Sequence, residues 1–470
     1  MRKSFVAAAG IAVLLAGCTV GPNYHRPQIQ APSTFRAPTP QSASDTASLA
    51  DLKWFEVFKD EQLQELERIA LVQNYDLRDA VAHVEAARAN LGITRSNQFP
   101  NFGASAELSA IRVSRNGETP LPRALVPSQN RTFGQATLDF LSFEVDIWGR
   151  LRRATEAARA NLLGAEETRK AVVTTLVSDV ATAYLSLREL DSQLEISQRT
   201  LESRQASLQL IKNRQTGGVA TRLDLRQGEQ LVYTAAETIP TLQEQIEQTE
   251  NQINLLLGKN PGEIRRGRSL TAQDFPPEVP AGLPSSLLER RPDIRAAEQN
   301  LIAANAEIGV AKAAYFPQIS LSGFLGGQGT QLSSLFSGRS AVWSLTPQVT
   351  QPIFTAGRLR SNVRLSEAEQ QSALIEYEKA IQTAFSEVSD ALIAHQRVRE
   401  SRVQQELLVV ALEDRTRLAY VRYRGGVDAL LNALDADRDL FQAELSLSQI
   451  RLSELLSVVQ LYKALGGGWQ

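Results

Sequence analysis

The stretch that decides the fold covers residues 359–424 and reads LRSNVRLSEAEQQSALIEYEKAIQTAFSEVSDALIAHQRVRESRVQQELLVVALEDRTRLAYVRYR. It contains no Gly and no Pro, the residues that most often end a helix. Residues 151–216 form a second such stretch, in which Gly164 is the only interruption. As continuous helices these stretches would each be about 100 Å long, because an α-helix rises about 1.5 Å per residue. Helices of this length are typical of coiled coils, and apolar residues spaced by threes and fours support that interpretation.

The chain contains an internal duplication that includes both long stretches. The matching motifs keep the same order in each half, and they are Asp76-Leu77-Arg78 with Asp293-Ile294-Arg295, Phe99-Pro100 with Phe316-Pro317, Gly149-Arg150-Leu151-Arg152 with Gly357-Arg358-Leu359-Arg360, and Gly217-Gly218-Val219 with Gly425-Gly426-Val427. The first two pairs are 217 positions apart and the last two 208, so nine residues are missing from the second half. We therefore expect a first repeat over residues 51–283, with long helices at about 150–258. The second repeat would cover residues 284–470, with long helices at about 358–465.

Four segments of alternating apolar and polar residues predict β-strands, two in each repeat. They lie at about 102–113, 132–148, 317–327 and 342–354. Alternation over about ten residues is a weak signature of transmembrane barrel strands, and soluble strands have the same pattern, so the pattern alone leaves both interpretations open. Pro347 falls within the last segment, where its missing N–H group predicts a bulge or a bend.

The N-terminus predicts export and lipid attachment. Arg2 and Lys3 precede an apolar run from Phe5 to Ala16, which is the pattern of a secretory signal peptide over residues 1–17. The run is too short to span a bilayer, which takes about 20 residues. Cys18 follows and is the only cysteine of the chain, so it forms no intrachain disulfide. The sequence Leu15-Ala16-Gly17-Cys18 resembles the bacterial lipobox, whose cysteine receives a diacylglycerol and becomes the mature N-terminus, so we interpret Cys18 as lipidated rather than as a chance cysteine. It begins a Pro-rich extended tether over residues 18–50.

Composition and motifs argue against nucleic-acid binding and against catalysis. Lys plus Arg total 50 and Asp plus Glu total 52, so the chain has no net positive charge to attract a polyanion. The three histidines, His25, His83 and His395, lie far apart and form no metal-ligand or catalytic spacing. We therefore expect no enzymatic activity, no cofactor and no metal, and we expect His395 to pack within a long helix.

Four membrane strands per chain would require an oligomer, because an open sheet edge in lipid leaves backbone groups unpaired. Two copies would give eight strands, a barrel that side chains fill. Three copies would give twelve strands and leave a lumen. The strand number therefore favours a homotrimer.

A set of motifs resembles the TolC/OprM family of outer-membrane efflux proteins, and most closely its lipoprotein branch. The motifs are Leu15-Ala16-Gly17-Cys18, Val20-Gly21-Pro22-Asn23-Tyr24, the duplicated Gly-Arg-Leu-Arg, Arg290-Arg291-Pro292-Asp293-Ile294, and Leu461-Tyr462-Lys463-Ala464-Leu465-Gly466-Gly467-Gly468-Trp469. The resemblance covers the mature chain from Cys18. It implies a mixed α and β fold, in which each duplicated protomer contributes four strands to a trimeric twelve-stranded transmembrane β-barrel. It also implies long coiled-coil helices that form a periplasmic α-barrel.

The resemblance further implies a function and partners. The protein would be a passive exit duct for drugs or other small molecules, lipid-anchored in the bacterial outer membrane and extending into the periplasm. Its partners would be outer-membrane lipid, a periplasmic membrane-fusion adaptor and an inner-membrane pump, commonly of the resistance-nodulation-division class. The alternative is a periplasmic coiled-coil lipoprotein, either an efflux adaptor or a structural spacer. An adaptor would have one long helical hairpin, whereas this sequence predicts two.

By the same resemblance, a periplasmic gate follows the second Gly-Gly pair. Leu431 and Asp435 would face the channel axis, and their spacing of four places both on one face of a helix. Arg438, three residues beyond Asp435, would pair with it or with a neighbouring protomer. Without the resemblance, Asp435 and Arg438 would be interpreted as an ordinary solvent-exposed helix pair.

Three further residues, Tyr423, Arg424 and Asp428, lie around the same glycine pair and are expected to support the gate. The first-half counterparts of the gate residues are Leu223, Gln227 and Gln230, which keep the leucine and lose both charges. Only one hairpin would then carry the ionic part of the gate.

Overall fold

The structure is a computed structural model that describes residues 19–29, 32, 34–37, 48–57, 59–112, 114, 130–273 and 284–469. The predicted signal peptide and Cys18 lie outside the described residues. The chain forms two compact units. The first, which we call the sheet unit, contains the chain up to Pro27, Glu85–Gly164 and Ala297–Glu376. The second, the helical unit, contains Gln28–Val84, Ala165–Ala296 and Tyr377–Gln470.

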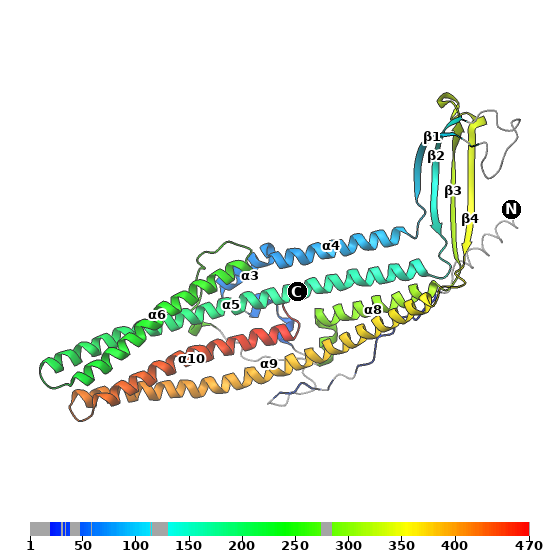
Figure 1. Cartoon of the computed structure of the whole chain (residues 1–470). Coiled ribbons are helices and arrows are strands. Elements are labelled where there is room, and N and C mark those ends of the chain that lie inside the picture. The colour runs from blue at the N-terminus through cyan, green and yellow to red at the C-terminus, as the bar shows by residue number, and fades with distance from the viewer. Residues whose placement is uncertain are drawn as a thin grey trace. The chain divides into compact units, whose positions relative to one another are not determined.

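Four strands form one antiparallel sheet in the order β1-β2-β3-β4 (Figure 1). The strands are β1 (Phe102–Arg112), β2 (Asn130–Glu144), β3 (Gln318–Gly329) and β4 (Ala341–Thr350), with the short 3₁₀-helices η4 (Leu332–Ser334) and η5 (Gly338–Ser340) between the last two. Among the strands that the structure describes, β1 and β4 each pair on one side only. Each therefore presents an open edge of backbone N–H and C=O groups.

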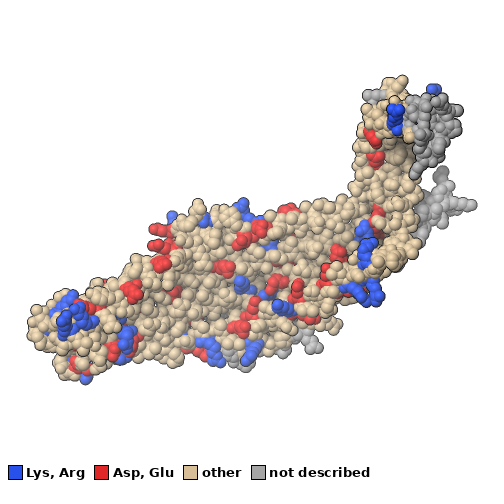
Figure 2. Space-filling model, in the orientation of Figure 1, with Lys and Arg blue, Asp and Glu red and all other residues tan. Residues whose placement is uncertain are grey.

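The two faces of the sheet differ in polarity. The pairing register places alternate residues on a common face, and one face holds apolar residues and glycine except at one end, where Arg112, Asn130 and Thr132 belong to it. Its apolar residues and glycines are Phe102, Ala104, Ala106, Leu108 and Ala110 of β1, Gly134, Ala136, Leu138 and Phe140 of β2, Ile319, Leu321, Gly323, Leu325 and Gly327 of β3, and Ala341, Trp343, Leu345, Pro347 and Val349 of β4. The opposite face carries Ser, Thr, Gln, Asp or Glu at most positions. Several apolar residues are largely exposed, among them Leu108 at 77% and Trp343 at 75%, and Figure 2 shows few charged side chains on the strands in view.

Pro347 does not produce the bulge that the sequence predicts. The ladder between β3 and β4 runs without a register shift, with Leu321 opposite Pro347. Because β4 is an edge strand in the chain, its proline is tolerated where the N–H group is not needed by the neighbouring strand. The irregularity lies instead between β2 and β3, where the register shifts between Phe140 and Phe143.

A glycine turn leads from each second strand into a long helix. Gly149 has a φ of +79° and Gly357 a φ of +85°, a left-handed conformation that glycine adopts without steric cost. β2 ends at Glu144 and β4 at Thr350, about four residues earlier than the sequence pattern suggests. The residues after them belong to these turns, which explains why the duplicated Gly-Arg-Leu-Arg motif begins with glycine.

The helices form two long hairpins and several shorter segments. The hairpins consist of α5 (Arg150–Thr216) with α6 (Arg222–Leu256), and α9 (Arg358–Arg424) with α10 (Leu430–Ala464). α5 and α9 have 67 residues each, and α6 and α10 have 35 each. The shorter helices are α2 (Trp54–Val57), α3 (Glu61–Gln73), α4 (Tyr75–Ser96), α7 (Leu287–Arg290) and α8 (Pro292–Ala313), with the 3₁₀-helices η1 (Leu49–Asp51), η2 (Leu270–Ala272) and η3 (Pro284–Ser286). Within the described ranges, no helix combines the length and the apolar character that a bilayer crossing requires.

Each hairpin turns at its Gly-Gly pair. Gly218 has a φ of +74° and Gly426 a φ of +73°, so the second glycine of each pair takes the left-handed conformation that ends a helix. Both turns lie at the same end of the helical unit (Figure 1), and Lys and Arg side chains gather there (Figure 2).

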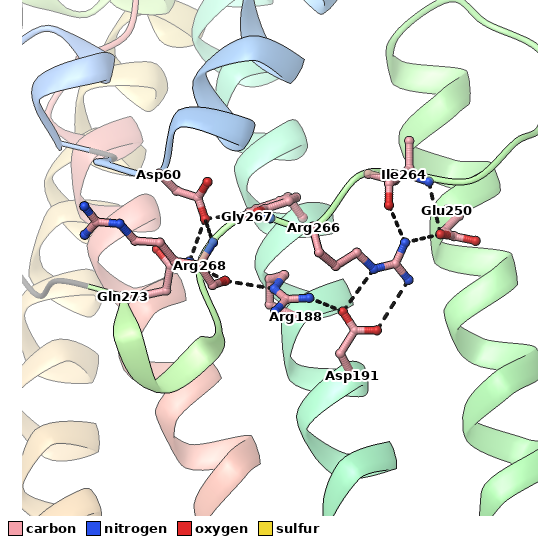
Figure 3. A network of polar contacts seen from close by, with 10 residues as sticks. Asp60, Arg188, Asp191, Glu250, Ile264, Arg266, Gly267, Arg268 and Gln273 are labelled. Carbon is pink, nitrogen blue, oxygen red and sulfur yellow. Dashed lines mark hydrogen bonds and ion pairs between the residues drawn. The ribbon is translucent and has the colours of Figure 1, made fainter.

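The core of the helical unit joins α3, α5, α6 and α10. Its fully buried members include Leu187 of α5, Ile253 of α6 and Val459 of α10. Beside it, Arg266 forms ion pairs with Asp191 and Glu250, which connect the segment after α6 to α5 and α6 (Figure 3).

A polar network next to this core centres on Asp60, the N-cap of α3 (Figure 3). Its Oδ2 accepts hydrogen bonds from the Tyr184 hydroxyl at 3.0 Å, the Arg268 N–H at 2.9 Å and Gln273 Nε2 at 2.9 Å. Burial by itself raises the pKa of Asp60, but the hydrogen bonds from Gln273, Arg268 and Tyr184 outweigh it and bring the pKa below the ordinary value. Asp60 is therefore a buried, ionised carboxylate that joins three segments of the unit.

The described start of the tether is fixed on the sheet unit. Gly21 has a φ of +98°, and a Cβ atom there would lie 2.5 Å from Gly309 Cα, so only glycine fits. The buried Arg153 guanidinium donates to the Val20 carbonyl at 3.4 Å and to Asn23 Oδ1 at 2.7 Å. The Val-Gly-Pro-Asn motif thus attaches the tether to Arg153 and to Gly309.

Candidate functional site

The candidate site surrounds the turn between α9 and α10, where the sequence places a gate. Leu431 lies in the first turn of α10 and is 49% exposed. Asp435 and Arg438 form an ion pair, with 3.2 Å between Oδ1 and Nη1, as predicted from their spacing. Their side chains are 38% and 61% exposed, so the pair contributes at most about 1 kcal/mol to stability. All three predicted residues therefore lie on the exposed side of α10.

The buried side of α10 packs against α9 and α5. Leu430 and Leu434 join Tyr423 of α9 and Ile211 of α5 in one apolar cluster. Tyr423 is 7% exposed, and the Arg214 guanidinium lies over its ring at 4.7 Å from the centroid. Tyr423 thus packs against the buried side of α10 and does not itself reach the exposed side.

Asp428 precedes Ala429, the N-cap residue of α10, and holds the turn through three hydrogen bonds. Its carboxylate accepts hydrogen bonds from Arg422 Nε at 3.1 Å, Asn432 Nδ2 at 2.7 Å and the Ala429 N–H at 2.9 Å. These bonds, that from Arg422 above all, lower the pKa of Asp428 below its ordinary value. Arg424 is exposed and ends α9, so Arg422 and not Arg424 is the basic residue that holds the turn.

One functional candidate was not predicted, the buried ion pair between Arg204 of α5 and Asp437 of α10. Arg204 Nε and Asp437 Oδ2 are 2.6 Å apart, and their side chains are 2% and 12% exposed. Arg204 also donates from Nη1 to the Leu231 carbonyl at 3.0 Å, and its guanidinium lies over the Phe441 ring at 4.8 Å. A signal was available in the sequence, since Asp437 lies at an apolar-stripe position between Leu434 and Phe441. A carboxylate at such a position needs a buried partner.

The first hairpin lacks this ionic arrangement. Leu223, the counterpart of Leu431, is 66% exposed near the start of α6. Gln227 and Gln230 occupy the positions of Asp435 and Arg438 and carry no charge. The two hairpins therefore have helices of the same lengths and differ in the charges at these two positions.

In the part of the chain described, no three or more His, Cys, Asp or Glu side chains lie together as metal ligands. His395 is half-buried and shares a hydrogen bond of 2.9 Å between its Nδ1 and the Ser457 hydroxyl. Burial lowers its pKa below the ordinary value, which favours the neutral ring in a packing role.

Comparison with known proteins decides the family. The model of the family described as outer membrane efflux protein matches residues 66–259 and 283–467, most of the chain. The chain belongs to the outer membrane efflux protein family. The probable efflux pump outer membrane protein TtgC of Pseudomonas putida is 38% identical over 475 residues, which cover 100% of this chain and 96% of that protein. The toluene efflux pump outer membrane protein TtgF of Pseudomonas putida is 40% identical over 481 residues, covering 99% and 97% respectively.

Solved structures of efflux channels have the same fold. The open state of the MtrE outer membrane channel of Neisseria gonorrhoeae superposes with a TM-score of 0.86 at 33% identity, covering 96% of this chain and 99% of that one. The predicted resemblance and the mixed helix-and-sheet fold are thus confirmed. The protein is an outer-membrane efflux channel and not an enzyme, and the alternative of a periplasmic coiled-coil lipoprotein is set aside.

Proposed function

We propose that three copies of the chain close their sheets into a twelve-stranded transmembrane β-barrel and that the long helices form a coiled-coil α-barrel in the periplasm. The observation that carries this proposal is the sheet itself, with a face that is apolar over most of its length and two open edges. An apolar face suits contact with lipid, and open edges cannot remain unpaired there. Three copies make the smallest barrel with a lumen, whose wall would be the polar face.

The assembled trimer would act as a passive exit duct for drugs or other small molecules. The relatives named above are outer-membrane components of efflux pumps, in one case for toluene. By analogy, a periplasmic membrane-fusion adaptor and an inner-membrane pump, of the resistance-nodulation-division class, would deliver the substrate. The chain itself supplies the conduit and no energy.

We also propose that Cys18 is lipidated and anchors the mature protein to the outer membrane. Support comes from its place after the apolar run and from the described start of the tether, Thr19 to Gly21, which packs on the sheet unit. Mass spectrometry of the N-terminal peptide should find Cys18 as the first residue, carrying lipid. An unmodified thiol, or a start elsewhere, would contradict the anchor and leave the channel proposal in place.

The gate of this channel would lie at Leu431, Asp435 and Arg438, with Tyr423, Arg424 and Asp428 supporting the turn. Three Asp435 carboxylates around one axis would attract cations and repel anions. Leu431 would narrow the same mouth with apolar side chains. The exposed position of all three gate residues on α10 leaves them free to face such a lumen.

Single-channel recording in a planar bilayer tests the proposal. Wild-type protein should form narrow, cation-preferring pores. Asp435→Ala should raise conductance and reduce cation selectivity, whereas Leu431→Ala should raise conductance and leave selectivity largely intact. Leu223→Ala, at the equivalent exposed leucine of the first hairpin, and Asp414→Ala, which removes an exposed carboxylate of α9, are matched controls that should change neither property.

No pore from the purified protein would refute the channel. Pores that respond to neither gate substitution would refute the gate alone.

A further inference from the structure

Helix α3 packs into a core that includes both long hairpins, far from their Gly-Gly turns. Leu63, Leu66 and Ala70 of α3 belong to one buried apolar cluster with residues of α5 and α6 from the first hairpin and of α10 from the second. Ile253 and Val459 are fully buried members of this cluster near the C-terminal ends of α6 and α10. The packing of α3 therefore helps to hold the two hairpins together.

Glu67 lies in the middle of the buried face of α3. It is 0% exposed, and Leu63 and Ala70, one turn away on either side, are buried as well. Among the described residues, neither of its carboxyl oxygens has a hydrogen-bond partner. A carboxylate that is buried without a partner is far more costly than the neutral acid, so burial raises the pKa of Glu67 well above its ordinary value. The packed helix therefore accommodates Glu67 in its protonated form.

The charged groups of the surrounding elements do not compensate a charge on Glu67. Arg68, on the same helix, favours the ionised form, but its side chain is exposed and pairs with Glu65. The Tyr462 hydroxyl of α10 donates to the Leu52 carbonyl at 2.9 Å. Burial above all raises the pKa of Tyr462, and the nearby Glu67 and Glu56 carboxylates raise it further. The other charged groups of the packed helices interact elsewhere, Lys170 of α5 with Glu167, Arg188 of α5 with Asp191, Glu189 of α5 with Gln193, Glu250 of α6 with Arg266, Glu454 of α10 with Arg402, and Lys463 of α10 with Asp179.

The start of the same helix needs the opposite charge state. Asp60, the N-cap of α3, lies seven residues before Glu67, or about two helical turns. Its carboxylate accepts hydrogen bonds from Tyr184, Arg268 and Gln273, which favour the ionised form (Figure 3). Helix α3 thus packs with a charge at its start and a neutral acid at its centre.

We propose that α3 is a proton-dependent clamp, a helix that holds the two hairpins together while Asp60 is ionised and Glu67 is protonated. Loss of the Glu67 proton places an unpaired charge in the core, and α3 then moves off the hairpins so that water reaches the carboxylate. Protonation of Asp60 weakens the hydrogen bonds at the start of the helix and has the same effect. All these groups belong to one helical unit of one chain, so the clamp depends neither on the number of copies nor on the gate.

The two carboxyl groups limit the clamp on opposite sides of about pH 4. The folded pKa of Asp60 is lowered, so its contribution is complete above the unfolded value of about 3.9 and is lost as the pH falls through the folded value. The folded pKa of Glu67 is raised, so its contribution is complete below the unfolded value of about 4.3 and is lost as the pH rises through the folded value. Weakening of the clamp between pH 5 and pH 8 therefore belongs to Glu67 alone.

Hydrogen exchange of the full chain in mild detergent tests the clamp. Protection is expressed relative to the chemical exchange rate at each pH, so that only opening of the structure is compared. The amides from Leu66 to Ala70 should lose at least about tenfold protection between pH 5 and pH 8, since each pKa unit of difference is worth a factor of ten. Glu67→Gln should abolish this loss, because its amide stays neutral over the whole range. Glu65→Gln is the matched control on the same helix, with a side chain 56% exposed, and should keep the loss seen in the wild type.

A second variant guards against a failure of Glu67→Gln to fold. Glu67→Met places an apolar side chain of similar length in the same core, and its protection should likewise be independent of pH between 5 and 8. Equal wild-type protection at pH 5 and pH 8 would overturn the proposal. So would a loss in both Glu67 variants as large as in the wild type, because the titrating group would then lie elsewhere. A loss abolished equally by Glu65→Gln would assign the effect to surface charge and overturn the role of Glu67.

Discussion

Removing Asp437 should loosen the contact between the two hairpins far more than removing any exposed carboxylate nearby. Asp437→Ala leaves the Arg204 guanidinium, whose side chain is 2% exposed, without its only carboxylate contact in the described chain. Breaking a buried pair by removing one partner costs about 3 to 5 kcal/mol. Arg204 keeps the Leu231 carbonyl and the Phe441 ring, so the lower end of that range applies.

Hydrogen exchange of the α10 backbone measures this effect directly. A loss of about 3 kcal/mol corresponds to a decrease in amide protection of about two orders of magnitude around Phe441. Asp439→Ala is the matched control on the same helix, because its ion pair with Arg415 is 2.8 Å long but has side chains 36% and 49% exposed. It should cost less than about 1 kcal/mol.

The double variant Arg204→Met with Asp437→Leu separates the charge from the packing. Apolar residues of similar volume often replace a buried ion pair at no cost, so protection should return close to the wild-type value. If Asp437→Ala changes protection no more than Asp439→Ala does, the buried ion pair does not hold the two hairpins together. If the double variant is as unprotected as the single one, the loss does not stem from an uncompensated charge.

Two further predictions concern Asp60 and the close approach of strands. The folded pKa of Asp60 is lowered, so its contribution to stability is present above the unfolded pKa of about 3.9 and is lost as the pH falls through the folded value. Asp60→Asn should therefore lower the apparent melting temperature at pH 7 and make it depend less on pH below about pH 4. Melting temperatures measured over a range of pH would contradict this role if they fell below pH 4 as steeply in the variant as in the wild type. A Cβ on Gly326 would lie 2.1 Å from the Ala136 carbonyl oxygen, so Gly326→Ala should disrupt the pairing of β2 with β3 and lower the yield of folded protein. Gly338→Ala, where the space around the Cβ is open, should give the wild-type yield, and equal yields from the two variants would show that the strands can separate to accept the methyl group.

The long helices and their turns were predictable because their determinants are local. The absence of Gly and Pro from residues 359–424 predicts α9, which runs from Arg358 to Arg424. The Gly-Gly pairs predict the turns, since a left-handed residue is needed where each helix stops. The duplication then predicted the second hairpin from the first.

The strand ends and the buried ion pair were not predicted, because they depend on contacts distant in sequence. The alternation of apolar and polar residues continues past Glu144 in the sequence. Only the turn at Gly149, seen in the structure, shows where β2 ends. Within the single chain β4 pairs with β3 alone and Pro347 leaves that register unshifted, which depends on the sheet order and not on the strand's own sequence. The partner of Asp437 is Arg204, 233 positions away, and no spacing rule within one helix connects them.

If Cys18 is lipidated as proposed, the attachment of the tether would set the depth at which this channel sits in its membrane. Thr19 lies against the turn from β2 into α5, where a Cβ on Gly149 would be 2.8 Å from its Cγ2, and the Val20 N–H donates to the Trp148 carbonyl at 3.0 Å. Cys18 directly precedes Thr19 in the sequence. Acyl chains on Cys18 would enter the bilayer level with this turn, at the foot of the strands. Movement of the proposed barrel along the membrane normal would then draw the acyl chains out of the lipid or break the hydrogen bond from the Val20 N–H to the Trp148 carbonyl. A short segment at the N-terminus would therefore fix the depth of the proposed assembly.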